Sequence, residues 1–177
     1  MKYREEKDLL GKENVPSDAY WGIHTYRALK NFNVSPYKIH GEFIKAYGYV
    51  KKACAMTIKE LNVWDEKKAQ AIIQACDEVI SGKLDEEIVI DAVQGGAGTS
   101  LNMNINEVIT NRALEIFGKS KGEYSFIDPL DDVNKFQSTN DTYPTALKIA
   151  CIFLPINLLR NRLEPQYFRP KSNMGKR

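Results

Sequence analysis

Two short polar segments of the sequence carry residue types that could bind a small anion. The first is the glycine-rich run Gly95–Gly98, which leads directly into Thr99 and Ser100. The second is Ser138–Asn140, which offers two hydroxyls and an amide. At the start of a helix, such groups and the free backbone N–H groups bind carboxylates without a buried cation. Two clusters of neutral donors would suit a dicarboxylic acid.

The same residues also have a purely structural interpretation, which the pattern leaves open: both segments could simply cap helices. Nucleotide binding is not favoured, because the sequence has no GK[ST] motif. The spacing Gly96-x-Gly98 also lacks the third glycine of a dinucleotide-binding loop, since that position is Leu101.

Three asparagines follow the glycines at every second position: Asn102, Asn104 and Asn106. They cannot all share one face of a helix, because residues two apart point in different directions. For Asn102 and Asn106 we favour the satisfaction of buried backbone groups. For Asn104, a structural role and a contact to a bound substrate are left open.

The elements that would position these segments are predicted to be helices. Apolar residues recur at helical spacing across Glu42–Leu61, and again after Asp65, a preferred N-cap residue. Gly82 should end the second helix, and Gly118 should end a third that covers Leu101–Phe117. The chain is therefore predicted to be mainly α.

The two ends of the chain are expected to be less regular. Residues 1–40 are rich in turn-forming and aromatic residues and are predicted to form an irregular arm. For Arg27 and His24 in this arm, packing and a carboxylate contact are both open, and we favour structural roles. Pro144 should occupy the first turn of a last helix. Its apolar run, residues 146–154, should be ended by Pro155.

Composition excludes several classes of protein. The 177 residues are 43% hydrophobic and 27% charged, which is typical of a globular domain, and no apolar run predicts a membrane span. Cys54, Cys76 and Cys151 stand alone, which favours reduced thiols that fill apolar space in a cytoplasmic protein. His24 and His40 have no cysteine or carboxylate at ligand spacing, so no metal site is predicted.

The charge is unevenly spread along the chain, although its net value is only +2. Residues 155–177 hold six basic side chains and one acidic, whereas residues 1–154 hold 19 basic and 22 acidic. A basic end can be an arm that binds nucleic acid. Residues 155–177 lack a groove-binding helix pattern, so we predict no nucleic-acid partner. We interpret this segment as not belonging to the same original sequence as residues 1–154.

Three stretches carry a resemblance to a known family. They read EEKDLLGKENVPSDAYWGIHTYRALKNF, QGGAGTSLNMNINEVITNRALEI and DDVNKFQSTNDTYPTALKIA, and the last two together are highly specific. They are similar to the aspartase/fumarase superfamily and, within it, to the aspartate ammonia-lyases. The resemblance covers roughly residues 4–153.

The resemblance implies a mainly α fold, in which long central helices form a homotetrameric bundle and each active site draws on three subunits. It implies an N-terminal helical domain over residues 1–140 and the start of a central bundle helix over 141–154, with 155–177 a tail outside the family pattern. It implies L-aspartate and fumarate as partners and no cofactor. The substrate-binding residues it implies are Thr99, Ser138, Thr139 and Asn140, with Ser100 and Asn104 as further candidates.

Within the superfamily, this chain is nearer to the aspartate ammonia-lyases than to the fumarases. Fumarases typically read SGTQSNMNVNEV, HVN and SQSSND, whereas this chain reads GGAGTSLNMNINEV, DDVN and QSTND. Asp132 occupies the position of the histidine in the fumarase segment HVN. The implied reaction is the reversible elimination of ammonia from L-aspartate to give fumarate. A fragment of a class II fumarate hydratase and a non-catalytic remnant are the alternatives.

Two motifs of the family are absent from the 177 residues: the TH motif and the GSS loop, which carries the serine base. We therefore expect no catalytic residue in this chain and no activity from it alone. The change in proline content and charge near residue 154 suggests a frameshift there. Resequencing that finds no downstream frame encoding the two motifs would reject the frameshift.

Overall fold

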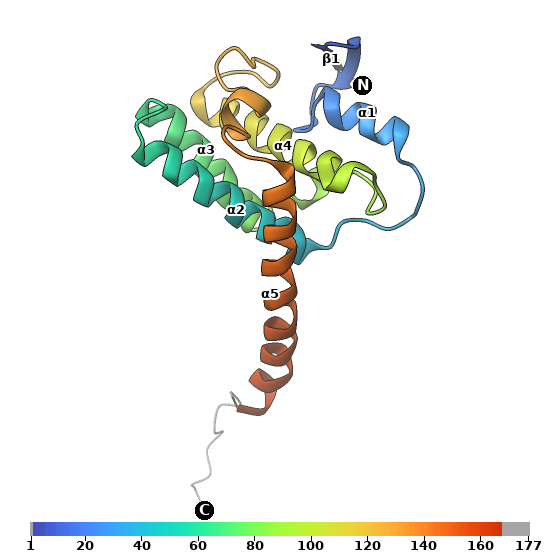
Figure 1. Ribbon diagram of the computed structural model, residues 1–177, viewed down its shortest axis with the longest axis vertical. Coiled ribbons are helices and arrows are strands. Elements are labelled where there is room, and N and C mark those ends of the chain that lie inside the picture. Colours follow the sequence, from blue (N-terminus) through green and yellow to red (C-terminus); the bar gives the residue numbers. More distant parts are fainter. Residues whose placement is uncertain (1, 168–177) are drawn as a thin grey trace, which may run out of the picture.

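The computed structural model describes the backbone of residues 2–167 and the side chains of residues 2–159. Its body is built from α2 (Gly41–Glu60), α3 (Glu66–Ile80) and α4 (Thr99–Phe117), which pack side by side around an apolar core. A long helix, α5 (Thr139–Tyr167), starts within this body and leaves it as a stalk (Figure 1). The predicted mainly α fold is confirmed.

The predicted ends of the body helices are also confirmed. The Asp65 carboxylate accepts the Lys68 N–H at 2.8 Å and so caps α3. Gly82 and Gly118 follow α3 and α4 with φ of +80° and +88°, the left-handed conformation in which helices commonly end.

The predicted irregular arm is wrong for most of residues 1–40. Strands β1 (Tyr3–Asp8) and β2 (Gly11–Pro16) form an antiparallel hairpin, and α1 (Ile23–Asn31) follows. The hairpin residues are mostly charged, so they lack the apolar alternation that indicates a strand. Arg4 holds the hairpin to the chain after it, because its guanidinium donates to the carbonyls of Pro16, Ala19 and Trp21.

Short helical turns connect the main elements around the predicted site. They are η1 (Asp85–Glu87), η2 (Gly96–Gly98) and the π-helical turn η3 (Pro129–Val133). The turn η2 leads directly into α4, and η3 lies a few residues before α5.

The last helix differs from its prediction at both ends. It begins at Thr139, so Pro144 lies in its second turn, and it passes through Pro155 to reach Tyr167. Pro155 cannot donate to the carbonyl of Cys151, but both residues are exposed, so water can satisfy that carbonyl. The proposed domain boundary at residue 140 falls in the first turn of this helix and stays a prediction.

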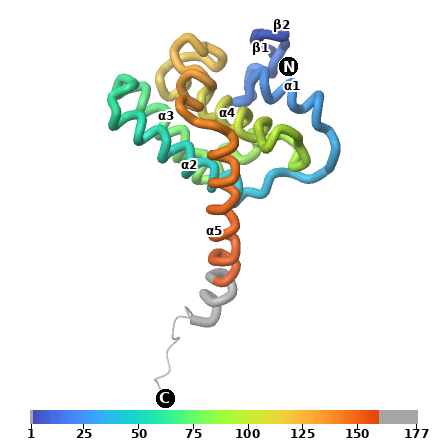
Figure 2. The backbone as a smooth tube through the Cα atoms, in the orientation of Figure 1, coloured from blue at the N-terminus to red at the C-terminus, as the bar shows by residue number. Residues whose placement is uncertain are grey.

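The stalk extends away from the body (Figure 2). Several of its apolar side chains are exposed, among them Ile152, Leu154 and Leu158. In the described part of the chain, the segment Thr139–Leu159 is long and apolar enough to cross a membrane by length and composition, with a mean hydropathy of 1.4. Its first turns belong to the folded body, however, since Thr142, Ala146 and Ala150 are buried. The tail predicted over residues 155–177 lies partly outside the described residues.

Candidate functional site

The second polar segment forms the start of α5. Ser138 caps this helix: its hydroxyl oxygen accepts the Asn140 N–H at 3.2 Å, and its carbonyl accepts the Thr142 N–H at 3.0 Å. Ser138 and Asn140 are exposed, and Thr139 is half-buried. Ser138 thus caps a helix, as one of the two interpretations expected, while its hydroxyl proton and the Asn140 amide stay accessible to a ligand.

The glycine-rich segment is a tight turn that delivers Thr99 to the start of α4. Gly96 and Gly98 have φ of +66° and +86°, which glycine adopts without steric strain. The Thr99 hydroxyl donates to the Gly96 carbonyl at 2.5 Å and lies at an exposed position. Ser100 is half-buried in the same first turn.

The two predicted segments lie next to each other. A Cβ atom added at Gly98 would overlap the ring of Tyr143, so the glycine backbone lies directly against the beginning of α5. Asn102 of α4 donates from its amide to the Thr139 hydroxyl at 3.0 Å. The N-termini of α4 and α5 therefore converge, and both place the positive end of a helix dipole at the same place.

The prediction that Asn102 and Asn106 satisfy buried backbone groups is wrong, because their side chains bind other side chains instead. Both donate to the side-chain oxygen of Asn134, at 3.0 and 3.1 Å. The Tyr47 hydroxyl donates to the Asn102 oxygen at 3.3 Å. This network holds the segment before α5 against α2 and α4.

Asn104 does not join the other candidates. Its side chain is fully buried, donates to the Glu87 carbonyl at 3.1 Å and accepts the Val89 N–H at 3.1 Å. Both groups of the amide are thus used to attach the chain after η1 to α4. We therefore leave Asn104 out of the substrate-binding set proposed below.

Lys51 is a member of the network that the sequence prediction missed. Its side chain is only 2% exposed, and its ammonium donates to Gln137 at 2.8 Å and to Asn134 at 3.1 Å. Burial lowers the pKa of Lys51 to about 7. The available signal was its position on the apolar stripe of α2, between Tyr47 and Cys54.

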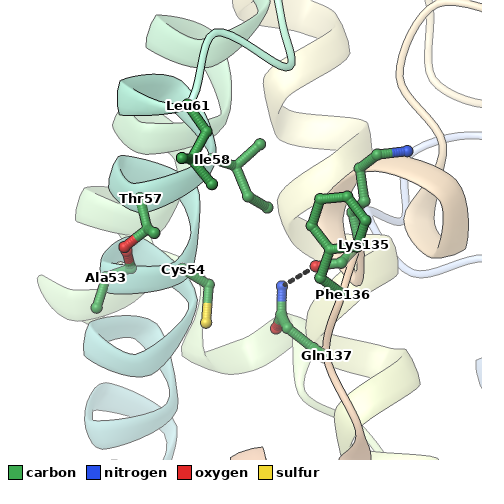
Figure 3. A pocket seen from close by; sticks show the side chains of 8 residues that line it. All are labelled: Ala53, Cys54, Thr57, Ile58, Leu61, Lys135, Phe136 and Gln137. Carbon is green, nitrogen blue, oxygen red and sulfur yellow. Dashed lines mark hydrogen bonds between the residues drawn. The ribbon is translucent and has the colours of Figure 1, made fainter.

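An open, mostly apolar pocket of about 380 Å³ lies beside this network, between α2 and the loop before α5 (Figure 3). One wall is formed by α2 residues, including Cys54 and Ile58, and the other by Lys135, Phe136 and Gln137. Phe136 is 78% exposed and has a φ of +61°. The lining has few polar groups, so the pocket suits an apolar contact more than a carboxylate.

The remaining predicted residues have structural positions. His40 caps α2. Arg27 contacts a carboxylate of the chain itself, Asp8, through a two-point ion pair at 2.6 and 2.8 Å that attaches α1 to the hairpin. Asp132 is paired with Lys68 at 3.1 Å. In the part of the chain that the structure describes, no group of His, Cys, Asp or Glu side chains could hold a metal ion.

The three thiols differ in exposure. Cys76 is fully buried, and burial raises its pKa to about 12, so it is an inert apolar residue as predicted. Cys54 is half-buried. The prediction of a buried thiol is wrong for Cys151, which is exposed on the stalk.

A family model described as Lyase matches residues 11–165 of the chain. The chain belongs to this lyase family, the aspartase/fumarase superfamily. An aspartate ammonia-lyase of Bacillus sp is 52% identical over 151 residues, which are 85% of this chain and 32% of the relative. The aspartate ammonia-lyase of Escherichia coli K12 is 53% identical over 150 residues, 83% of this chain and 31% of the relative.

Solved structures of lyases share the fold. A fumarate lyase:delta crystallin from Brucella melitensis superposes with a TM-score of 0.85 at 48% identity, over 91% of this chain and 36% of that one. A class II fumarase from Schistosoma mansoni gives a TM-score of 0.80 at 34% identity, over 93% of this chain and 36% of the fumarase chain. The chain thus spans about a third of the length of the proteins it matches.

Proposed function

We propose that this chain provides the N-terminal part of an aspartate ammonia-lyase, which reversibly eliminates ammonia from L-aspartate to give fumarate. The observation that carries the proposal is the convergence of Thr99 and Ser138–Asn140 at two adjoining helix starts. The aspartate ammonia-lyases that are about half identical to this chain support the choice of substrate.

The proposed role of this site is to bind and orient the substrate. Its exposed groups are the hydroxyls of Thr99 and Ser138 and the amide of Asn140, all of them neutral. In this proposal the Thr99 hydroxyl turns from the Gly96 carbonyl to the substrate. Neutral donors and two helix dipoles stabilise a carboxylate and the added negative charge that develops when a proton leaves the adjacent carbon. The base that takes this proton belongs to the remainder of the enzyme in our proposal.

Replacing Thr99 with valine tests this role, because the substitution keeps the shape and removes the hydroxyl. With complete lyase subunits that carry these residues, we expect kcat/KM for L-aspartate to fall about 10²-fold. Fumarate formation measures the change. The matched control is Thr57→Val on α2, where the hydroxyl also donates to a backbone carbonyl but lies on another surface. Unchanged kcat/KM in the Thr99 variant would contradict the assignment.

A fumarate hydratase is the second candidate, favoured by the structural match to the Schistosoma mansoni fumarase. The two activities differ in what adds to fumarate. Formation of aspartate from fumarate and ammonia would support the lyase that we propose. Formation of malate from fumarate and water, with no aspartate, would replace it with the hydratase.

We also propose that the stalk joins subunits into a homotetramer in the cytoplasm. Leu147, Cys151, Leu154 and Leu158 are exposed and recur at spacings of four, three and four residues. This spacing is the apolar seam by which helices pack into bundles. An uncovered seam of this kind would be an unusual apolar surface on a monomer.

A charge placed in the seam should weaken assembly. We expect Leu154→Glu to shift the protein toward the 20.2 kDa monomer, as measured by sedimentation equilibrium over a range of concentrations. Thr145→Glu is the control, because it adds the same charge at an exposed α5 position outside the seam. Identical masses for the two variants would argue against an interface at the seam.

A further inference from the structure

A buried lysine lies beneath the proposed substrate segment and has no carboxylate to neutralise it. The Lys51 ammonium contacts two amide oxygens, and it lies 5.8 Å from the centre of the Tyr47 ring. No ion pair joins Lys51 to an acidic side chain within residues 2–159. Burying a charge in this way opposes folding. A methionine would fill nearly the same space without that penalty, so fold stability does not explain a lysine here.

The contacts of Lys51 lead directly to the proposed site. Gln137, which accepts its shorter hydrogen bond, is the residue immediately before Ser138. The Gln137 amide also donates to the Val133 carbonyl at 2.8 Å. Asn134 donates to the Gln137 carbonyl at 3.1 Å. The loop before α5 is therefore closed on itself and attached to α2 through one ammonium group.

Asn134 connects the lysine to the other half of the site. Its side-chain oxygen receives three donors: Lys51 at 3.1 Å, Asn102 at 3.0 Å and Asn106 at 3.1 Å. Asn102 in turn donates to Thr139 at 3.0 Å. Lys51 thus acts on both sides of Ser138, through Gln137 on one side and through Asn134 and Asn102 on the other.

We propose that Lys51 is a positioning residue of the dicarboxylate site: its ammonium fixes Gln137 and Asn134 and places a positive charge behind the N-terminus of α5. This inference rests on the proposed function for the identity of the ligand. Lys51 itself is buried and acts through the loop, so it is not assigned a contact with substrate.

The surroundings of Lys51 make its charge sensitive to pH near neutrality. Burial is the largest influence on its pKa and lowers it to about 7, against the neighbouring thiols Cys54 of α2 and Cys76 of α3, which act to raise it. Burial raises the pKa of both thiols and of the Tyr47 hydroxyl, so these groups stay neutral. The α4 side and the loop contribute amides. Lys51 is therefore the group in this network whose charge changes near pH 7.

Nuclear magnetic resonance of the 177-residue chain can test the proposal without turnover. The ammonium nitrogen of Lys51 and the backbone amides of residues 137–140 would be followed over about two pH units on each side of neutrality. We expect the four amides to shift together with Lys51 around pH 7. In Lys51→Met that common shift should be lost. Lys52→Met is the matched control, because Lys52 is the next residue on α2 and pairs with Asp77.

The proposal is overturned if residues 137–140 do not titrate in the natural chain, or if they titrate equally in Lys51→Met. A second variant, Lys51→Gln, keeps an amide donor without the charge and must also lose the common shift. It tests the proposal if Lys51→Met does not fold. The two proposals can fail separately. Absence of the common shift would not change the proposed deamination of aspartate, and absence of deamination would not remove the shifts of residues 137–140.

Discussion

Replacing Glu107 with alanine is expected to lower the free energy of unfolding by about 4 kcal/mol, one of the two largest effects we predict. Glu107 lies on α4 and is completely buried. Its carboxylate accepts the N–H groups of Gly22, His24 and Thr25 at 2.8, 2.8 and 3.0 Å, and the Thr25 hydroxyl at 2.6 Å. Alanine would leave these buried donors without an acceptor.

The size of the effect follows from the way α1 begins. Its N-cap, Gly22, has no side chain to receive the first N–H groups of the helix, so Glu107 receives them from another element. Glu6 contributes as well, by accepting the Ile23 N–H at 2.8 Å. Complete burial raises the pKa of Glu107, and the hydrogen bonds from Thr25 and Gly22 oppose that rise.

Urea denaturation of the natural chain and of Glu107→Ala measures the loss of stability. Glu107→Gln is the matched control: it keeps the shape and one acceptor oxygen, so it should lose clearly less stability than the alanine variant. A loss below about 1 kcal/mol for Glu107→Ala would show that water or another side chain can take over the four donors.

Replacing Gly98 with alanine is expected to cost about 3 kcal/mol of stability, the second large effect. Two causes add. The φ of +86° is unfavourable for any residue with a Cβ atom, and that atom would overlap the Tyr143 ring. The start of α4 must then move away from α5, which would also separate Thr99 from Ser138 and lower the activity of the complete enzyme.

Gly118→Ala separates the two causes. Gly118 has nearly the same φ, +88°, but a Cβ atom there would meet nothing within 4 Å. It should therefore show the conformational cost alone, about 1 kcal/mol. Equal losses in the two variants, measured by urea denaturation, would mean that the contact with Tyr143 does not constrain the glycine loop.

The helices could be predicted from the sequence because their signals are local. The apolar stripe of residues 42–61, the Asp65 cap and the glycines after α3 and α4 each lie within a few residues of the element they define. The hairpin was missed because Tyr3–Asp8 is almost entirely charged. Its pairing is stabilised by Arg4, whose carbonyl acceptors lie 12 to 17 residues further along the chain.

The sequence predicted the exposed polar groups of the candidate site, but not the buried side chains that hold them in place. Thr99 and Ser138 were found because hydroxyls beside glycines or at helix starts have a recognisable pattern. Lys51 reaches Gln137 across 86 positions, and Asn102 reaches Thr139 across 37, so no local pattern links them. The role of Asn104 was equally hidden, because its partners are backbone groups before the glycine loop.

In the homotetramer that we propose, the stalk divides the formation of the protein into folding of each chain and association of the chains, two steps of different kinetic order. The core residues lie within the body and the first turns of α5, so the body can fold as a single chain. The apolar side chains of α5 from Ile152 to Leu159 are mostly exposed, and in the homotetramer that we propose they gain their burial from other subunits. The rate of the first event is independent of protein concentration, whereas the second accelerates as the concentration rises.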